Sequence, residues 1–428
     1  METLFLSPLT IIIIASIVGF FMAYGIGAND VANAMGTSVG SKAITLRQAI
    51  IIAAIFEFLG AYFGGGEVTS TIRKGIVDPT IYEDANKFII GMLSALLAAG
   101  TWLIVASRRG WPVSTTHSIV GAIIGFVSIS KGISYVSWGT VGGIASSWVT
   151  SPIIAALLAF LIYLSAKKSI LDNSNPGKRA INIIPVYSFY VAFIISLVIA
   201  RKGLKNTGLE LVESDIYIFS SIFGILAAAV TSITLRRNFT KIKKDGVESA
   251  FAILMVVSAC AMAFAHGSND VANAIGPLAA IVSTVNSNGI IDTSSPVQAW
   301  ILFLGAIGIV FGLSILGKNV IKTVGEKITT LKPSLGFSAE LATATTVVVA
   351  SYVGFPISTT HTLVGGVIGV GLARGAQHLN TKAIIRIITS WLVTIPIGAF
   401  LTILYWVILR IIFGVWYLNK KPRNYFWV

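Results

Sequence analysis

Cysteine and charged residues are scarce in this chain. Its 428 residues include a single cysteine, Cys260, so no disulfide can form within the chain. Only 11% of the residues are charged, whereas 55% are hydrophobic. The net charge of +14 therefore does not indicate nucleic-acid binding, because in a membrane protein basic residues first report topology.

Alternation of apolar and polar residues with a period of two is also absent, which disfavours a membrane barrel. Long hydrophobic runs take its place, and a helix needs about 20 apolar residues to cross a bilayer. We predict an all-α polytopic membrane protein with about twelve transmembrane or re-entrant helices. The predicted stretches are residues 8–28, 45–65, 87–106, 112–130, 138–164, 183–201, 216–235, 248–267, 298–316, 337–354, 356–373 and 383–414.

Two segments of the sequence occur twice. GANDVANA at 27–34 returns as GSNDVANA at 267–274, and PVSTTH at 112–117 returns as PISTTH at 356–361. The chain is therefore an internal duplication. Seven predicted crossings separate the two NDVANA helices, and an odd number turns the second copy upside down.

The duplication predicts three parts. Residues 1–165 form a first inverted repeat, residues 166–246 a connector with two helices, and residues 247–428 a second inverted repeat. Inverted repeats are typical of secondary transporters, which hold their substrate near the bilayer midplane where the copies meet.

Basic residues cluster after the fifth, seventh and ninth predicted helices, so these loops are expected to be cytoplasmic. The segment at 286–297 contains neither Lys nor Arg and is expected outside, although Arg73, Lys74, Arg201, Lys202 and Lys205 then depart from the rule. We predict a multi-pass protein of the cell membrane with both termini outside.

The NDVANA motifs place Asp30 and Asp270 at membrane depth, where an ionisable residue is a functional candidate. A carboxylate with the amide carbonyls of Asn29 and Asn269 nearby suits a hard monovalent cation, and an interrupted helix would add backbone carbonyls. The motifs therefore predict a site for sodium or for a proton. The alternative is that Asn and Asp cap a helix end, which does not account for near-identity in both copies.

The PxSTTH motifs predict an anion site. Proline suits the first turn of a helix, so the hydroxyls fall near a new N-terminus, where free N–H groups attract an anion. His117 and His361 could donate hydrogen bonds, titrate or hold the loop. The alternative is that Ser and Thr simply cap the helix. An aspartate accepts a hydrogen bond from a protonated oxyanion, so phosphate fits better than sulfate.

Two more acids, Glu57 and Glu340, lie in apolar stretches and are not repeat mates. They could form a further cation site or a gate; a protonated carboxyl, or one paired with a basic residue, is the alternative. The predicted sodium ligands are Asn29, Asp30, Glu57, Asn269, Asp270 and Glu340.

The duplicated motifs, with TIRKGI at 71–76, resemble the inorganic phosphate transporter (PiT) family, which includes sodium-dependent and proton-dependent symporters. The resemblance implies a phosphate symporter and matches Glu57 and Glu340 to family glutamates linked to transport. The phosphate-binding positions that it implies are Asp30, Asn33, Ser114, Thr115, Thr116, Asp270, Asn273, Ser358, Thr359 and Thr360.

Asn–Asp pairs with hydroxyls favour sodium as the driving ion. A proton-coupled phosphate or sulfate symporter of the same family stays open, as does an anion channel lined by the same polar rings. His, Ser or Thr and Asp also compose hydrolase triads, but the duplicated, membrane-embedded setting argues against an enzyme. The expected partners are phosphate, sodium and lipid, with no cofactor and no nucleic acid. The 41 glycines are compatible with a homodimer.

Overall fold

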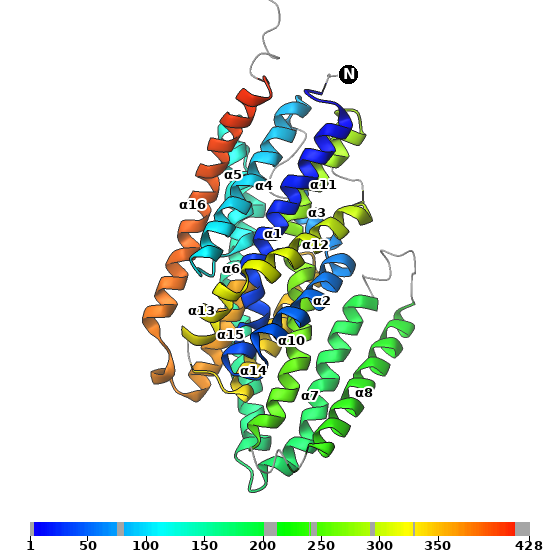
Figure 1. Cartoon of the computed structure of the whole chain (residues 1–428), viewed down its shortest axis with the longest axis vertical. Helices are drawn as coiled ribbons and strands as arrows, with labels where there is room; N and C mark the ends of the chain where they lie inside the picture. Colours follow the sequence, from blue (N-terminus) through cyan, green and yellow to red (C-terminus); the bar gives the residue numbers. More distant parts are fainter. Residues whose placement is uncertain are drawn as a thin grey trace, which may run out of the picture.

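The computed structural model describes residues 4–74, 81–200, 212–238, 240, 246–291, 296–327 and 330–415, and all the long elements in these ranges are helices (Figure 1). They are α1 (Pro8–Gly40), α2 (Leu46–Gly64), α3 (Gly66–Lys74), α4 (Ala85–Arg108), α5 (Thr115–Ser130), α6 (Trp138–Ala166), α7 (Pro176–Val198), α8 (Glu213–Arg237), α10 (Glu248–Asp270), α11 (Ala272–Asn286), α12 (Ala299–Leu316), α13 (Lys318–Lys327), α14 (Pro333–Tyr352), α15 (Thr359–Arg374) and α16 (Thr381–Ile412).

Each of the twelve predicted stretches corresponds to a helix, which confirms the all-α class. Ten helical segments of the described chain are long and apolar enough to cross a membrane, with α10 and α11 forming one of them. The helices α5 and α15 have only 16 residues each and do not reach that length. Two long helices, α7 and α8, lie between residues 166 and 246.

Three helices were not predicted. The short helices α3 and α13 are too polar to stand out as apolar runs, and α11 continues almost directly from α10. The first NDVANA motif was expected at a helix end, but it lies inside α1, which runs unbroken for 33 residues. The second motif spans the junction of α10 and α11, where Val271 alone separates the two and keeps helical dihedrals. Neither motif therefore opens a long break in its helix.

Helices of the two halves pack against each other in matching pairs. α1 packs on α12 as α10 packs on α2, and α5 packs on α16 as α15 packs on α6. Glycine makes the close contacts possible, because a Cβ on Gly121 would overlap the backbone of Ile395, and one on Gly365 would overlap the backbone of Pro152. These two glycines begin a further duplicated pair of segments, GAIIG at 121–125 and GGVIG at 365–369, which are thus helix-contact surfaces.

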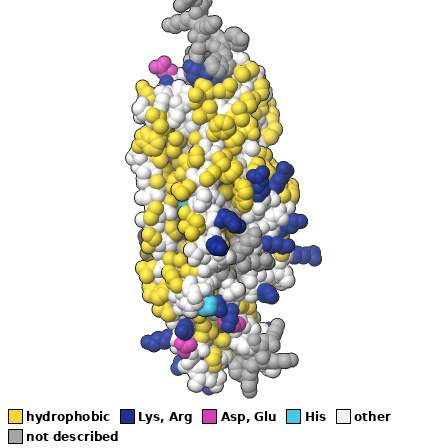
Figure 2. All heavy atoms as spheres, turned by 90° about the vertical axis from the view of Figure 1, so that its left-hand side faces the viewer, with side chains coloured by type: hydrophobic (Ala, Val, Ile, Leu, Met, Phe, Trp, Pro, Cys, Tyr) yellow, Lys and Arg dark blue, Asp and Glu magenta, His cyan; other side chains and the backbone are white. Residues whose placement is uncertain are grey.

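The inner and outer helices differ in burial. In the most apolar 18-residue stretch of α14, 83% of the residues are buried, and the corresponding share in α4 is 78%. In α6, α8 and α16 the share is only 22%. The outer helices present apolar side chains such as Leu157, Ile225 and Phe400 to the surroundings. Figure 2 shows one face covered largely by hydrophobic side chains, on which Lys and Arg gather in limited zones. This is the surface of a protein embedded in lipid.

The start of α1 and the end of α16 lie at the same end of the molecule, whereas the links from α6 to α7 and from α8 to α10 lie at the other end (Figure 1). Lys167 directly follows α6 and Arg237 is the last residue of α8, so both border the links at that second end. Several residues used in the topology prediction, and part of the TIRKGI and 286–297 segments, lie outside the described residues: 75, 76, 201, 202, 205, 241, 243, 244 and 292–295.

Candidate functional site

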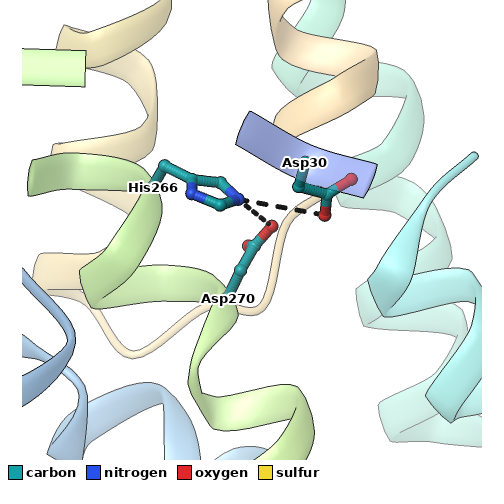
Figure 3. A group of neighbouring side chains, drawn as sticks. All are labelled: Asp30, His266 and Asp270. Atoms are coloured by element: carbon teal, nitrogen blue, oxygen red, sulfur yellow. Dashed lines mark ion pairs between the residues drawn. The ribbon is translucent and has the colours of Figure 1, made fainter. Parts of the chain in front are cut away.

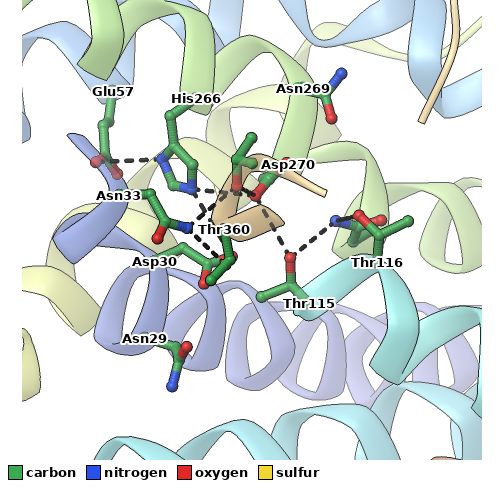
Figure 4. A network of polar contacts seen from close by, with 12 residues as sticks. Asn29, Asp30, Asn33, Glu57, Thr115, Thr116, His266, Asn269, Asp270 and Thr360 are labelled. Carbon is green, nitrogen blue, oxygen red and sulfur yellow. Dashed lines mark hydrogen bonds and ion pairs between the residues drawn. The ribbon is translucent and has the colours of Figure 1, made fainter. Parts of the chain in front are cut away.

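The four duplicated motif segments meet in the interior of the protein (Figure 4). The middle of α1 brings the first NDVANA motif, and the junction of α10 and α11 brings the second. The helices α5 and α15 begin at Thr115 and Thr359, so their N-termini carry the STTH motifs, as the sequence predicted. All the predicted site residues are buried.

Three carboxylates surround one imidazole at the centre of the site. His266 Nε2 lies 3.2 Å from Asp270 Oδ2 and 3.9 Å from Asp30 Oδ2 (Figure 3). Its other nitrogen, Nδ1, lies 3.2 Å from Glu57 Oε1. Four side chains from α1, α2 and α10 thus form one group, and none of the four is more than 1% exposed.

The charge of this group is unbalanced. Three ionised carboxylates carry three negative charges, and a protonated imidazole supplies at most one positive charge. Within the described chain, no Lys or Arg side chain pairs with Asp30, Glu57 or Asp270. Buried charges in proteins are paired or coordinate metal ions, so bound cations or protons would be needed to neutralise the excess negative charge of this group. Neither oxygen of Asp30 accepts a hydrogen bond, which leaves that carboxylate available to a ligand.

The threonine hydroxyls at the two helix starts point at Asp270. Thr359 Oγ1 donates to Asp270 Oδ2 over 2.8 Å, and Thr115 Oγ1 donates to the same oxygen over 3.4 Å. One carboxylate oxygen therefore receives a hydroxyl from each half of the chain. The N-termini of α5 and α15 converge here with their partial positive charges.

The amides of the NDVANA motifs contact the threonines of the opposite half. Asn33 Nδ2 lies 3.2 Å from Thr359 Oγ1 and 2.9 Å from Thr360 Oγ1. In the matching arrangement, Asn273 Nδ2 lies 3.3 Å from Thr115 Oγ1 and 3.4 Å from Thr116 Oγ1. The two halves therefore share one site instead of forming one each. The remaining threonine hydroxyls also cross over, since Thr116 donates to the carbonyl of Ile357 and Thr360 to that of Val113.

The serines of the STTH motifs cap their helices. Ser114 Oγ accepts a hydrogen bond from the backbone N–H of His117, and Ser358 Oγ accepts one from His361, each over 3.2 Å. The capping alternative raised from the sequence thus describes both serine side chains. The structure does not bring them into contact with the carboxylates.

Asn29 and Asn269 point away from the carboxylates (Figure 4). Asn29 donates to Ser107 and to the carbonyl of Trp111, and its Oδ1 accepts from the N–H of Val113. Asn269 donates to Ser351 over 2.9 Å. These amides hold the segments that lead into the STTH helices.

Glu340 belongs to a separate cluster. Thr37 donates to its Oε1 over 2.6 Å, Ser38 donates to the same oxygen, and Ser258 donates to Oε2 over 2.6 Å. Thr37 follows Asp30 by two turns of α1, which at 1.5 Å per residue is roughly 10 Å along the helix. Of the two extra acids, the structure joins Glu57 to the centre through His266 and sets Glu340 apart.

His266 was missed by the sequence reasoning because its repeat mate is Ile26, so it does not appear in the duplicated pattern. A usable signal was its spacing, since residues four apart lie on the same helix face and His266 precedes Asp270 by four.

His117 and His361 lie in a ring cluster between the halves. Their ring centroids are 4.5 Å apart, with Trp148 against His117 and Trp391 against His361. Nδ1 of His117 lies 3.2 Å from the carbonyl oxygen of Trp391, and Nδ1 of His361 lies 3.1 Å from that of Trp148. Of the roles left open for these histidines, the geometry favours holding the two helix starts together.

Residues 36–40 read GTSVG, which has the spacing of a hydrolase nucleophile elbow. That motif needs a sharp turn from a strand to a helix, but this segment lies within α1 and its Ser38 hydroxyl is bound to Glu340. The geometry gives no nucleophile there.

A helical bundle that spans the membrane and gathers carboxylates, amides and helix N-termini at its centre has the architecture of a transport protein. Comparison with known proteins identifies the group. Residues 26–402 match the model of the phosphate transporter family, and the chain belongs to this family. It is therefore a membrane transport protein and not an enzyme, as predicted.

The chain is similar over nearly its whole length to several relatives. It is 51% identical over 407 residues to a putative phosphate permease of Haemophilus influenzae, an alignment that covers 94% of this chain and 97% of the relative. It is 44% identical to inorganic phosphate transporter 2-1, chloroplastic, of Arabidopsis thaliana, covering 92% of this chain and 71% of the relative. A solved structure described as the sodium-dependent phosphate transporter superposes with a TM-score of 0.88 at 41% identity, covering 94% of this chain and all of that one.

Proposed function

We propose that the chain is a secondary active symporter that carries inorganic phosphate on a sodium gradient by alternating access. One observation carries the proposal: two helix N-termini that suit an anion converge on a buried group of three carboxylates and one imidazole. A phosphate held there meets negative charge unless cations arrive with it. Coupling of the two ions follows from the electrostatics of the site.

The phosphate site consists of the starts of α5 and α15, whose first two residues are threonines. The hydroxyls of Thr115 and Thr359 would turn from Asp270 to phosphate oxygens, and the amides of Asn33 and Asn273 lie within reach of the same hydroxyls. Asp30 accepts a hydrogen bond from the P–OH group that phosphate still carries near neutral pH, which favours phosphate over sulfate. Family membership supports the same choice.

Sodium is the driving ion because the central oxygens are the hard ligands that this ion prefers. Asp30, Glu57 and Asp270 supply carboxylate oxygens around His266. The name of the superposed structure, a sodium-dependent transporter, supports the assignment. The amides of Asn29 and Asn269 act on the sodium site indirectly, by holding the segments that lead into the STTH helices.

Glu340 forms a second sodium site with the hydroxyls of Thr37, Ser38 and Ser258. All four side chains are fully buried, and each hydroxyl oxygen keeps lone pairs that a cation can share. This site links α1, α10 and α14, so its occupancy would stabilise the packing of the helices that carry Asp30 and Asp270.

The transport cycle rests on the two-repeat arrangement, with residues 1–165 and 247–428 as inverted repeats around the connector 166–246. The matching packing of α5 on α16 and of α15 on α6 supports it. Both termini face outside the cell membrane, a placement supported by the basic residues Lys167 and Arg237, which border the links at the opposite end of the molecule. The homodimer compatible with the glycine content stays a prediction.

Proton coupling is the second candidate, and His266 is the observation that favours it. An imidazole with carboxylates facing both nitrogens is a ready proton carrier, and it would replace sodium as the source of positive charge.

The deciding experiment is uptake of labelled phosphate into liposomes that contain the purified protein. Uptake is measured with an inward sodium gradient, with a matched potassium gradient or with a pH gradient alone, and excess sulfate is added as a competitor. Accumulation driven by sodium and insensitive to sulfate is expected. Accumulation with the pH gradient alone would assign the carboxylates to protons, and uptake that never exceeds electrochemical equilibrium would indicate a channel.

A further inference from the structure

A groove with a volume of about 390 Å³ runs between α6 and α14. Its lining on α6 extends from Ser146 to Leu158, the middle of a 29-residue helix, so it lies at the depth of the hydrocarbon core. Its rim includes Ile154, Val349 and Val353, which are 49%, 57% and 64% exposed. The groove therefore opens sideways towards the bilayer.

The groove has little affinity for water, although hydroxyls line it. Ser146 and Ser147 donate to carbonyls of α6, and Thr345 and Thr346 donate to carbonyls of α14. The hydrogens of these four hydroxyls are used within their own helices. Thr150 and Ser151 are the other hydroxyl residues of the lining, Ser151 Oγ accepts a hydrogen bond from Thr362, and no charged residue lines the groove. A water molecule needs two to four polar partners to stay, so an apolar occupant is favoured.

The other half of the chain shows what fills the equivalent place. Thr346 lies twelve residues before Ser358, just as Trp102 lies twelve residues before Ser114. Likewise, Ser151 lies three residues after Trp148, just as Thr394 lies three residues after Trp391. Between α4 and α16, the indole of Trp102 is 8% exposed and donates to Thr394 over 3.2 Å. Between α6 and α14, the small Thr346 leaves the same place hollow.

We propose that an acyl chain of a bilayer phospholipid occupies the groove between α6 and α14. The hydrocarbon core offers no other abundant molecule of this shape and polarity, and about 300–1,000 Å³ is the usual size of a site for a small ligand. An empty apolar groove would forfeit the dispersion contacts of its walls. The acyl chain takes the role that the Trp102 indole has in the other half.

The groove also borders the transport site. Phe355 and Ile357 line it, and both belong to the segment that leads into the second STTH helix. The carbonyl of Ile357 accepts a hydrogen bond from Thr116 over 2.9 Å, and that of Phe355 lies 3.4 Å from Asn269 Nδ2. A bound acyl chain thus supports the start of α15 from behind.

The test is photo-cross-linking in liposomes that contain a phospholipid with a diazirine midway along one acyl chain. In the wild-type protein, cross-links are expected to concentrate on peptides 146–158 and 345–357. Thr346→Trp should abolish them, because the indole fills the groove. Trp102→Thr should create a new cross-linked site on α4 and α16. Ile222→Trp, on the exposed face of α8, is the matched control and should change nothing.

The wild-type map decides even if a variant fails to fold. Cross-links spread evenly over all exposed helices would overturn the proposal, as would a Thr346→Trp protein that folds and labels like the wild type. A second copy of the chain in the groove would instead show as a dimer in native mass spectra that Thr346→Trp dissociates, without acyl labelling, and this would also overturn it. None of these readouts depends on which ions are transported.

Discussion

Asp30→Asn isolates the electrostatic part of the proposed site. The substitution keeps the shape of the side chain and removes one negative charge from a carboxylate whose oxygens accept no hydrogen bond. Two unit charges about 4 Å apart attract each other by up to about 4 kcal/mol at an effective dielectric constant of about 20. Since about 1.4 kcal/mol corresponds to a factor of ten, the affinity for sodium should fall by as much as about a thousandfold.

The assay is phosphate uptake into liposomes over a range of sodium concentrations, combined with the stabilisation of the detergent-purified protein by sodium alone. Asp84→Asn is the matched control, because Asp84 caps α4 away from the site and asparagine caps a helix equally well. The control should behave like the wild type. An Asp30→Asn protein with normal sodium dependence in both measurements would remove this carboxylate from the mechanism.

The remaining predictions concern other contacts of the site. Thr359→Val and Thr115→Val should each raise the phosphate KM, because each removes a hydroxyl that turns from Asp270 to a phosphate oxygen, and a hydrogen bond to a charged group contributes about 1.5–3 kcal/mol. Unchanged KM values in both variants would contradict this. Gly267→Ala should lower the melting temperature, since its Cβ would overlap the backbone of Glu57, whereas Gly142→Ala, with open space around it, should not; equal melting temperatures would refute the close-contact argument. Glu340→Gln should weaken stabilisation by sodium in the absence of phosphate, and an unchanged sodium titration would exclude a cation site there.

The sequence predicted the helical architecture well because hydrophobic length is a strong signal in a membrane protein. All twelve apolar stretches are helices, and the STTH motifs do start α5 and α15. The prediction of a helix break at each NDVANA motif was wrong, because α1 continues through the first motif and only one residue separates α10 from α11 at the second. Composition does not reveal whether a polar motif lies within a helix or at its end.

The directions of the side chains in the site were harder to predict from the sequence than the helices that carry them. Asn29 and Asp30 are neighbours in sequence but project about 100° apart around a helix, so one holds the segment near Val113 while the other faces His266. His266 lacked a repeat mate and escaped a search based on duplication. Glu340 was grouped with Glu57 as a further cation site or gate, but Glu57 contacts His266 whereas Glu340 lies where α14 packs against α1 and α10.

The crossed contacts of the asparagines also bear on how the protein is made. Asn33 bonds to threonines 326 and 327 residues later in the chain. At a synthesis rate of about 5–20 residues per second, roughly 20 to 60 seconds pass between the two. During that interval Asp30 lies in the membrane without the groups that complete its site. A late step of biosynthesis is therefore the packing of the second half against polar groups of the first half that are already in the membrane. Until then, the membrane insertion machinery must shield these polar groups from lipid.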